Sequence, residues 1–375
     1  QRTAFGHRWA TTAAIQSAVD ACAAAGGGTV VLRGGVFKSA TIRLRSRVAL
    51  DIAKDATLLG SERAADYPEI APAVDYLYRD RFKKSLIYAE RASDIALTGA
   101  GVVDGQGARF PARKDDDLER PYLVRFSECR NVRVSGLTFR DSARWLSHYL
   151  VCTNVEIEGV TIRSRIRENR DGMDIDSCDG VRISKCDVYS GDDAIVLKST
   201  AGLPCRRVTV SDCRLSSLAS ALKLGTESQG GFSDILFRDC TVYDTRDAIA
   251  IEEVDGGICE RVIVSNIVMR GVDVPIFVRL GNRANPIPGR PKPGVGRMRD
   301  IRICGVEASD VATSACPIAG IPGHPVENVT IENVRLRFAG GGTAADAARV
   351  PPEREDAYPR GRMFGALPAF GIYAR

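Results

Sequence analysis

One four-residue pattern recurs along the chain and decides the fold. It reads Cys129-Arg-Asn-Val132, Cys152-Thr-Asn-Val155, Cys178-Asp-Gly-Val181, Cys205-Arg-Arg-Val208 and Cys259-Glu-Arg-Val262, with Phe232-Ser-Asp-Ile235, Met298-Arg-Asp-Ile301 and Val326-Glu-Asn-Val329 as variants. The last residues of successive copies are 23, 26, 27, 27, 27, 39 and 28 positions apart. A repeat of this length indicates a solenoid, in which each repeat stacks on the one before.

Each repeat contains short alternating runs rich in β-branched residues, such as Val208-Thr-Val210 and Ile195-Val-Leu197, separated by Gly, Asp, Asn and Ser. Such runs predict strands joined by turns. No repeat has a ten-residue helical pattern, so βαβ folds and leucine-rich horseshoes fit poorly. We therefore predict an all-β chain, a right-handed parallel β-helix in which equivalent residues stack about 4.8 Å apart.

Eight of the eleven cysteines follow the repeat. Five of them begin a copy of the pattern, and Cys186, Cys213 and Cys240 lie five residues after its last position. Other copies have Val, Leu, Ile, Phe or Met at these places, which is typical of buried apolar positions. The prediction is buried thiols, with disulfides between neighbouring coils as the alternative.

Both ends of the chain depart from the repeat. Residues 11–25 have a Thr at the start, helical apolar spacing and a Gly26-Gly-Gly28 stop, which together predict an N-terminal capping helix. We expect one β-helix domain over residues 1–340 and a C-terminal tail, residues 341–375, packed on it. The Pro- and Gly-rich segment 281–296 predicts a long loop.

Composition excludes several classes of function. With 375 residues, 44% of them hydrophobic, the chain can bury a large core. The net charge of +5 has its signs mixed along the sequence, which argues against a nucleic-acid partner. No apolar run approaches the roughly 18 residues of a membrane span. The chain has three histidines and no Walker loop, HExxH motif or nucleophile elbow. We expect no metal, no cofactor, no membrane partner and a monomer.

Carboxylates concentrate in Asn169-Arg-Asp171-Gly-Met-Asp174-Ile-Asp176 and in Gly191-Asp192-Asp193. Strand alternation predicts Asp171 one coil from Asp193, with Asp192 beside them, on one outward face. Repulsion there would raise the pKa of at least one carboxyl and leave an acid beside ionised bases. Hydrolysis of a glycoside with inversion requires that pairing. The alternative is an acidic surface that is merely hydrated or that binds calcium.

These motifs resemble the family 28 glycoside hydrolases, the polygalacturonases and rhamnogalacturonases, which are right-handed, pectin-lyase-like β-helices. The resemblance covers about residues 12–280 and includes Ala56-Thr-Leu-Leu-Gly-Ser61 and Gly101-Val-Val-Asp-Gly-Gln-Gly107. Asp171 and Asp192 are 21 residues apart, as in the family. The resemblance implies Asp192 as the general acid, Asp171 and Asp193 as the residues that activate water, and a pectic or related plant glycan as the substrate.

Two motifs of that family are missing. Its Gly-His-Gly falls on Ala219-Ser220-Ala221, and its Arg-Ile-Lys falls on Ala250-Ile251-Glu252, so the two cations that face a galacturonate carboxylate are lost. Glu252 would repel such a carboxylate, which predicts a neutral or deoxy sugar in the pocket. An acidic sugar held by Lys198 or Lys223 is the alternative.

Further residues are expected to bind substrate, namely Trp145, His148, Asp174, Lys223, Glu227, Glu252 and Arg279. Trp145 would stack on a sugar and His148 would bind hydroxyls, with core packing as the alternative for both. Arg279 would replace a missing cation. The tail resembles that of a bacterial subgroup and would close one end of the cleft, which favours exo-action.

The predicted function is an inverting, exo-acting glycoside hydrolase that differs from a standard polygalacturonase. We expect it to be periplasmic or secreted, with any export signal trimmed before Gln1. Two alternatives stay open: a polysaccharide lyase on the same scaffold, which would use calcium and a Lys or Arg base, and a carbohydrate-binding β-helix without activity.

Overall fold

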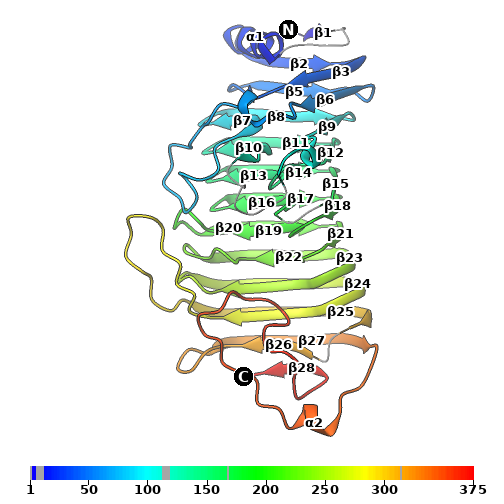
Figure 1. Cartoon of the computed structure of the whole chain (residues 1–375), viewed down its shortest axis with the longest axis vertical. Helices are drawn as coiled ribbons and strands as arrows, with labels where there is room; N and C mark the ends of the chain where they lie inside the picture. Colours follow the sequence, from blue (N-terminus) through cyan, green and yellow to red (C-terminus); the bar gives the residue numbers. More distant parts are fainter. Residues whose placement is uncertain (1, 6–11, 112–118, 167–168, 313–314) are drawn as a thin grey trace. The chain divides into compact units, whose positions relative to one another are not determined.

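The computed structural model describes residues 2–5, 12–111, 119–166, 169–312 and 315–375. They form two compact units. The first unit is Gln1–Asp174 with Cys178–Asp192, and the second unit is Ile175–Ser177 with Asp193–Arg375. Figure 1 shows that both units consist of strands from successive turns of the chain lying side by side, and the strands pair in parallel, as β11 does with β14 and β23 with β24.

The first unit has three series of paired strands. Its elements are β1 (Arg2–Phe5), α1 (Thr12–Ala24), β2 (Gly28–Leu32), β3 (Gly35–Ser39), β4 (Ile42–Arg43), β5 (Val48–Ile52), β6 (Ala56–Gly60), η1 (Ala64–Asp66), β7 (Ser85–Glu90), β8 (Ser93–Gly99), β9 (Val102–Asp104), η2 (Gly107–Arg109), β10 (Tyr122–Ser127), β11 (Arg130–Ser135), β12 (Thr138–Arg140), β13 (Ser147–Leu150), β14 (Thr153–Glu158), β15 (Thr161–Ser164), β17 (Asp179–Ser184) and β18 (Asp187–Ser190). Strands β8, β11, β14 and β17 pair in parallel and align Val132 with Val155 and Val181. Strands β9, β12, β15 and β18 form a second series, and β7, β10 and β13 form a third.

The second unit continues the same period with longer strands. Its elements are β19 (Ile195–Lys198), β20 (Cys205–Ser211), β21 (Arg214–Ser217), β22 (Ser220–Leu224), β23 (Phe232–Glu253), β24 (Ile258–Leu280), β25 (Arg297–Val311), β26 (Ala315–Ala319), β27 (Val326–Phe338), α2 (Ala344–Ala347) and β28 (Gly371–Ala374). Strand β16 (Met173–Asp176) is divided between the two units. Strand β23 pairs with β24 along its whole length, from Phe232 opposite Cys259 to Glu253 opposite Leu280. The predicted parallel β-helix is confirmed.

A sharp turn precedes the last residue of each repeat, and a left-handed residue makes it. In the first unit φ is 58° at Asp94, 53° at Asn131 and 55° at Asn154. Asn and Asp adopt this conformation more readily than most residues do. The side-chain amide of Asn154 also donates to Oδ1 of Asn131 at 2.7 Å, so the turns of neighbouring coils are linked.

The cysteine columns appear as predicted. Phe232 lies between Cys205 and Cys259, and the main-chain N–H of Cys152 donates to Sγ of Cys178 at 3.3 Å. All eleven cysteines lie in the described ranges as thiols, and ten of them are buried, so the prediction of buried thiols is confirmed. Burial raises the pKa of the Cys152 and Cys259 thiols, which keeps them protonated and unreactive.

Helix α1 confirms the predicted capping helix, although residue 11 lies outside the described ranges. Residues 281–296 form the predicted loop between β24 and β25. In the C-terminal segment, β28 pairs with β26, and Phe364 and Leu367 pack against Val274 and Phe277 of β24. The division at residue 340 stays a prediction. None of the helices described is long and apolar enough to cross a bilayer.

Candidate active site

Asp171 and Asp192 come together in the first unit. One carboxylate oxygen of each lies within 4.8 Å of the other. The main-chain N–H of Asn169 donates to Oδ2 of Asp192 at 2.9 Å, and the N–H of Asp192 donates to the carbonyl of Arg170 at 3.3 Å. Asp171 is buried and Asp192 is half-buried, so solvent reaches the pair through Asp192.

Asp193 follows Asp192 in the chain and belongs to the second unit. Its Oδ1 accepts a hydrogen bond from the main-chain N–H of Ser220 at 3.0 Å, and its Oδ2 lies 3.0 Å from Nζ of Lys223. Burial alone would raise the pKa of Asp193, but the charges of Lys223, Lys198 and Arg246 hold it below its ordinary value. Asp193 is therefore ionised at neutral pH.

Glu252 shares Lys223 with Asp193. Nζ of Lys223 lies 3.7 Å from Oε2 of Glu252, which also accepts a hydrogen bond from the hydroxyl of Thr226 at 2.8 Å. Burial raises the pKa of Glu252 to about 7, although Lys223 and Thr226 act in the opposite direction. Glu252 therefore gains or loses its proton near neutral pH, whereas Asp193, which pairs with the same lysine, stays ionised.

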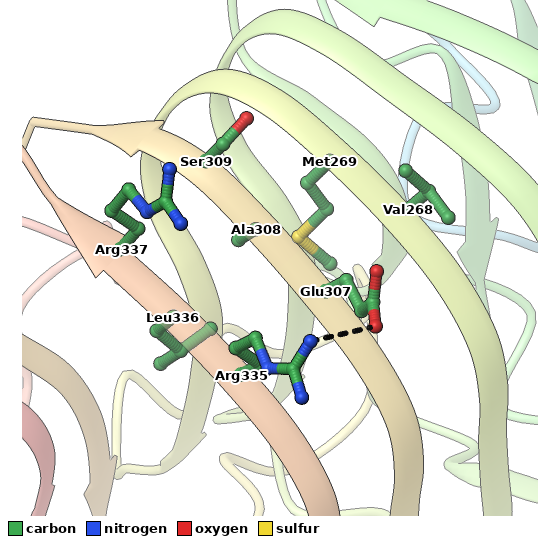
Figure 2. A pocket seen from close by; sticks show the side chains of 8 residues that line it. All are labelled: Val268, Met269, Glu307, Ala308, Ser309, Arg335, Leu336 and Arg337. Carbon is green, nitrogen blue, oxygen red and sulfur yellow. Dashed lines mark ion pairs between the residues drawn. The ribbon is translucent and has the colours of Figure 1, made fainter.

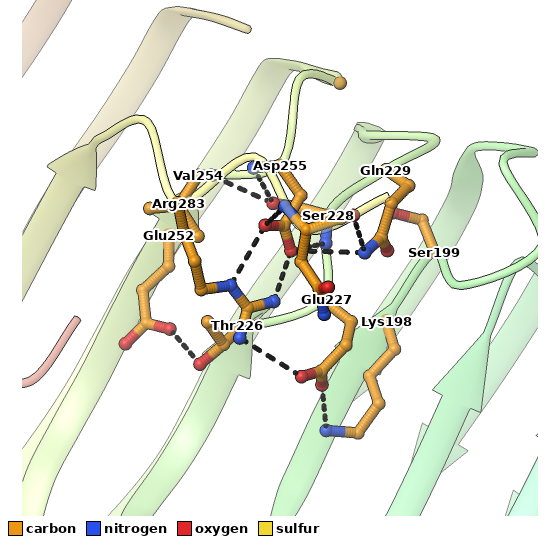
Figure 3. Close-up of polar contacts among 12 residues, drawn as sticks. Lys198, Ser199, Thr226, Glu227, Ser228, Gln229, Glu252, Val254, Asp255 and Arg283 are labelled. Atoms are coloured by element: carbon orange, nitrogen blue, oxygen red, sulfur yellow. Dashed lines mark hydrogen bonds and ion pairs between the residues drawn. The ribbon is translucent and has the colours of Figure 1, made fainter. Parts of the chain in front are cut away.

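A second buried ion network surrounds Glu227 (Figure 3). Oε2 of Glu227 lies 3.0 Å from Nζ of Lys198, and Oε1 lies 3.5 Å from a guanidinium nitrogen of Arg283. Arg283 also pairs with both carboxylate oxygens of Asp255. Burial would raise the pKa of Glu227, but Lys198 and Arg283 hold it well below its ordinary value. Both lysines of the predicted site are thus neutralised by carboxylates.

Arg279 lies apart from these networks and holds the C-terminal segment. Its guanidinium donates to the carbonyls of Gly320 at 2.7 Å, Glu353 at 3.0 Å and Arg354 at 3.1 Å. Burial, followed by the charge of Arg375, lowers the pKa of Arg279 to about 10, so it remains charged at neutral pH. Arg283, four residues later, is the arginine that reaches Glu227.

Trp145 and His148 lie in an aromatic cluster of the first unit. The rings of Tyr122 and His148 stack with centroids 5.5 Å apart, and Trp145 contacts both rings edge-on, at 6.0 Å and 5.4 Å. His148 is 0% and Trp145 is 5% exposed, so packing accounts for both side chains as they stand. Asp174, on β16, is also fully buried. Their roles in binding stay predictions.

The sequence interpretation gave no role of their own to Arg283, Asp255 and Thr226. Arg279 and Arg283 stand in one short run, Arg-Leu-Gly-Asn-Arg, and β24 ends at Leu280 between them. Strand alternation therefore predicts which way the side chain of Arg279 faces, but it makes no prediction for Arg283, which lies beyond the end of the strand. Asp255 follows Glu252 and Glu253 in an acidic turn, and that cluster was the available signal.

A hollow of about 400 Å³ lies elsewhere on the second unit, among Val268, Met269, Glu307, Ala308, Ser309, Arg335, Leu336 and Arg337 (Figure 2). The hollow lies on β24, β25 and β27. Its residues Val268 and Met269 pair with residues 241–242 of β23, whereas Glu252 is ten residues further along that strand and pairs with Arg279. An exposed ion pair joins Glu307 and Arg335 at 3.7 Å. This hollow is therefore on another face of the coils than Glu252.

Carboxylate oxygens are also ligands that Ca²⁺ accepts. Asp171 and Asp192 offer one oxygen each within 4.8 Å of one another. Chelation therefore belongs among the tests of the site.

Comparison with known proteins places these residues in a family. Residues 29–354 match the glycosyl hydrolases family 28. A probable polygalacturonase of Vitis vinifera is 29% identical over 366 residues, which cover 91% of this chain and 72% of that protein. An exo-poly-α-D-galacturonosidase of Dickeya chrysanthemi is 34% identical over 131 residues, covering 33% of this chain and 21% of that protein.

Solved structures share the fold. An exopolygalacturonase from Thermotoga maritima superposes with a TM-score of 0.77 at 22% identity, covering 90% of this chain and 88% of that one. A family 28 exopolygalacturonase of Yersinia enterocolitica gives 0.76 at 19% identity, covering 98% and 78%. The family match runs through most of both units, and it includes both aspartate motifs. The chain belongs to the glycosyl hydrolases of family 28.

Proposed function

We propose that the chain hydrolyses a glycosidic bond of a pectic or related plant glycan, with Asp192 as the general acid and Asp171 and Asp193 activating water. The observation that carries this proposal is the pair of carboxylate oxygens, one from Asp171 and one from Asp192, within 4.8 Å. Two carboxyl groups beside one scissile bond supply the acid and the base that glycoside hydrolysis needs. Asp193, which Lys223 keeps ionised, adds a base next to the acid in the chain.

The stereochemical course we propose is inversion. Inverting enzymes generally hold their two carboxyl groups about 6.5–9.5 Å apart and retaining enzymes about 5–5.5 Å apart. The oxygens of Asp171 and Asp192 are closer than the inverting range, so inversion here rests on the family and on a third carboxylate rather than on that spacing. If Asp171 instead attacked the anomeric carbon, the product would retain its configuration.

The sugar we propose is neutral or deoxygenated. Lys223 is neutralised by Asp193 and Glu252, and Lys198 is neutralised by Glu227. A galacturonate carboxylate in contact with Lys223 would compete with two buried carboxylates for its charge, which costs binding free energy. Exo-action is part of the proposal, because the C-terminal segment reaches Lys223, whose Nζ lies 5.9 Å from the centroid of the Tyr358 ring. Action outside the cytoplasm and a monomeric state stay predictions.

The test begins with the wild-type chain and a panel of pectic fragments, using release of reducing sugar as the readout. Asp192→Asn is expected to lower kcat about 10²–10⁴-fold while the affinity for the glycan is kept, because the amide cannot donate the proton. The exposed Asp212→Asn is the matched control, since Asn adopts its left-handed conformation as easily. Normal turnover by Asp192→Asn would contradict the proposal.

NMR of the first-formed anomer tests the stereochemical course. Inversion is the expected result, and a retained configuration would identify Asp171 as a nucleophile. Addition of a chelator is expected to leave activity unchanged. Loss of activity on chelation, together with a product that absorbs in the ultraviolet, would identify a calcium-dependent lyase instead.

A further inference from the structure

The C-terminal segment brings an aromatic ring to the buried ion networks of the second unit. Nζ of Lys223 lies 5.9 Å from the centroid of the Tyr358 ring, and the guanidinium carbon of Arg283 lies 5.6 Å from it. These are the cations that bind Asp193, Glu252 and Glu227. Tyr358 is nevertheless 49% exposed. It therefore lies at the boundary between the buried ion networks and solvent.

The charges of Glu227, Glu252 and Asp193 lie close enough to the hydroxyl of Tyr358 to affect its pKa. Lys223 alone would lower the pKa of this hydroxyl, but burial of the group and the charges of Glu227 and Glu252 raise it above its ordinary value. The hydroxyl consequently keeps its proton and can donate a hydrogen bond at any neutral pH. A half-exposed aromatic residue that also carries a polar hydroxyl is a common binding contact.

The segment that carries Tyr358 is fixed on both sides of it. Before it, Arg279 donates to the carbonyls of Glu353 and Arg354, and the N–H of Asn282 donates to the carbonyl of Glu355 at 2.7 Å. After it, Gly361 approaches β23 and β24 so closely that a Cβ there would lie 2.3 Å from Oδ1 of Asp247. The ring is thus held in place before any ligand arrives, which lowers the entropic cost of binding.

We propose that Tyr358 is a substrate-binding and specificity-determining residue whose ring stacks on the apolar face of a sugar bound beside Lys223 and Glu252. The inference rests on the proposed function and adds to it a contact from outside the coils. A pyranose ring presents C–H groups on its faces, and a flat aromatic ring covers them while its edge stays hydrated. A galacturonate bound there would add a carboxylate near Glu252 and Glu227, and the repulsion between these groups favours a neutral sugar.

The test compares Tyr358→Ala, Tyr358→Phe and the control Phe370→Ala. Phe370 is on the same segment, is 42% exposed and packs on Phe338 with ring centroids 5.8 Å apart. Tyr358→Ala is expected to raise KM about 10-fold with kcat within about 3-fold and an unchanged Tm. Tyr358→Phe keeps the ring and is expected to stay within about 3-fold of the wild-type KM. Phe370→Ala is expected to leave KM unchanged.

Calorimetric binding of the best pectic oligosaccharide to Asp192→Asn, with and without Tyr358→Ala, separates binding from turnover. The expected result is a Kd about 10-fold weaker with Tyr358→Ala. An unchanged KM and Kd, or a KM that rises only together with a fall in Tm, would overturn the inference and leave the hydrolase proposal standing. If the wild type turns over no fragment of the panel, the proposed function fails, and the binding experiment still decides the role of Tyr358.

Discussion

Two buried glutamates of the second unit have opposite pKa shifts because their partners differ. Glu227 faces Lys198 and Arg283, which outweigh its burial, whereas Glu252 shares Lys223 with Asp193, so burial prevails and its pKa rises to about 7. A carboxyl whose pKa is raised in the folded chain binds a proton that the unfolded chain has already lost. Its contribution to stability is therefore complete below its ordinary pKa of 4.5 and is lost as the pH rises to about 7.

Glu252→Gln tests this shift. The wild type is expected to lose up to about 3 kcal/mol of unfolding free energy from this residue between pH 4.5 and pH 7, and the amide, which has no proton to lose, is expected to remove that part of the pH dependence. Chemical denaturation at several pH values measures it. Glu227→Gln is the control, because the pKa of Glu227 is shifted in the opposite direction. This substitution breaks a buried ion pair and is expected to lower the free energy of unfolding at pH 7 by about 3 kcal/mol. Parallel pH profiles for the wild type and Glu252→Gln would contradict the shift.

Sequence reasoning reached these residues unevenly. Strand alternation is enough to put Lys223 opposite Ala250 and Ser220 opposite Asp247, and both pairs are observed. Which carboxylate pairs with which lysine depends on how far the side chains extend from one coil to the next. Strand alternation does not contain that information. Arg283 and Tyr358 lie in irregular segments, where no periodicity predicts the direction of a side chain.

The register of the strands depends on a short turn that recurs from coil to coil. The residue before each repeat's last position is left-handed, including Asp234 at φ 59°, Asn328 at 51° and two arginines, Arg207 at 53° and Arg261 at 54°. An L-residue with a Cβ that is neither Asn nor Asp pays about 1–2 kcal/mol in this region. The recurrence of Asn, Asp and Gly before an apolar residue was the sequence signal that made the period of the β-helix predictable.

Arg207→Asn is therefore expected to raise the unfolding free energy by about 0.5–1 kcal/mol, since Asn adopts the left-handed conformation at lower cost. Arg207 is exposed and follows the buried Cys205 on β20. The adjacent Arg206→Asn is the control: Arg206 is also exposed and is not among the residues with positive φ, so no gain is expected there. Equal effects of the two substitutions on Tm would show that charge, not conformation, decides the outcome.

Across the whole chain, the repeat predicted the β-helix and the buried thiols. Helical apolar spacing predicted the capping helix, and Pro and Gly content predicted the 281–296 loop, because each depends on local pattern. The course of the C-terminal segment could not be predicted in the same way. It is fixed by main-chain carbonyls that accept hydrogen bonds from Arg279 and Arg375, and any sequence provides such carbonyls. The sequence does show Arg279, but the resemblance predicts for it a substrate-binding role rather than contacts with main-chain carbonyls.

Arg279→Met tests whether that clamp holds the segment in place. The substitution keeps an apolar stem beside Phe364 but leaves the carbonyls of Gly320, Glu353 and Arg354 without this donor, which is expected to cost about 2–3 kcal/mol of unfolding free energy. The released segment should become a substrate for limited proteolysis between residues 350 and 375, and KM should rise at least as much as in Tyr358→Ala, because the ring is no longer positioned. Arg362→Met is the control: its ion pair with Asp273, at 2.9 Å, is largely exposed and is expected to contribute less than about 1 kcal/mol. Wild-type resistance to protease in Arg279→Met would show that the apolar contacts of Phe364 and Leu367 hold the segment without the clamp.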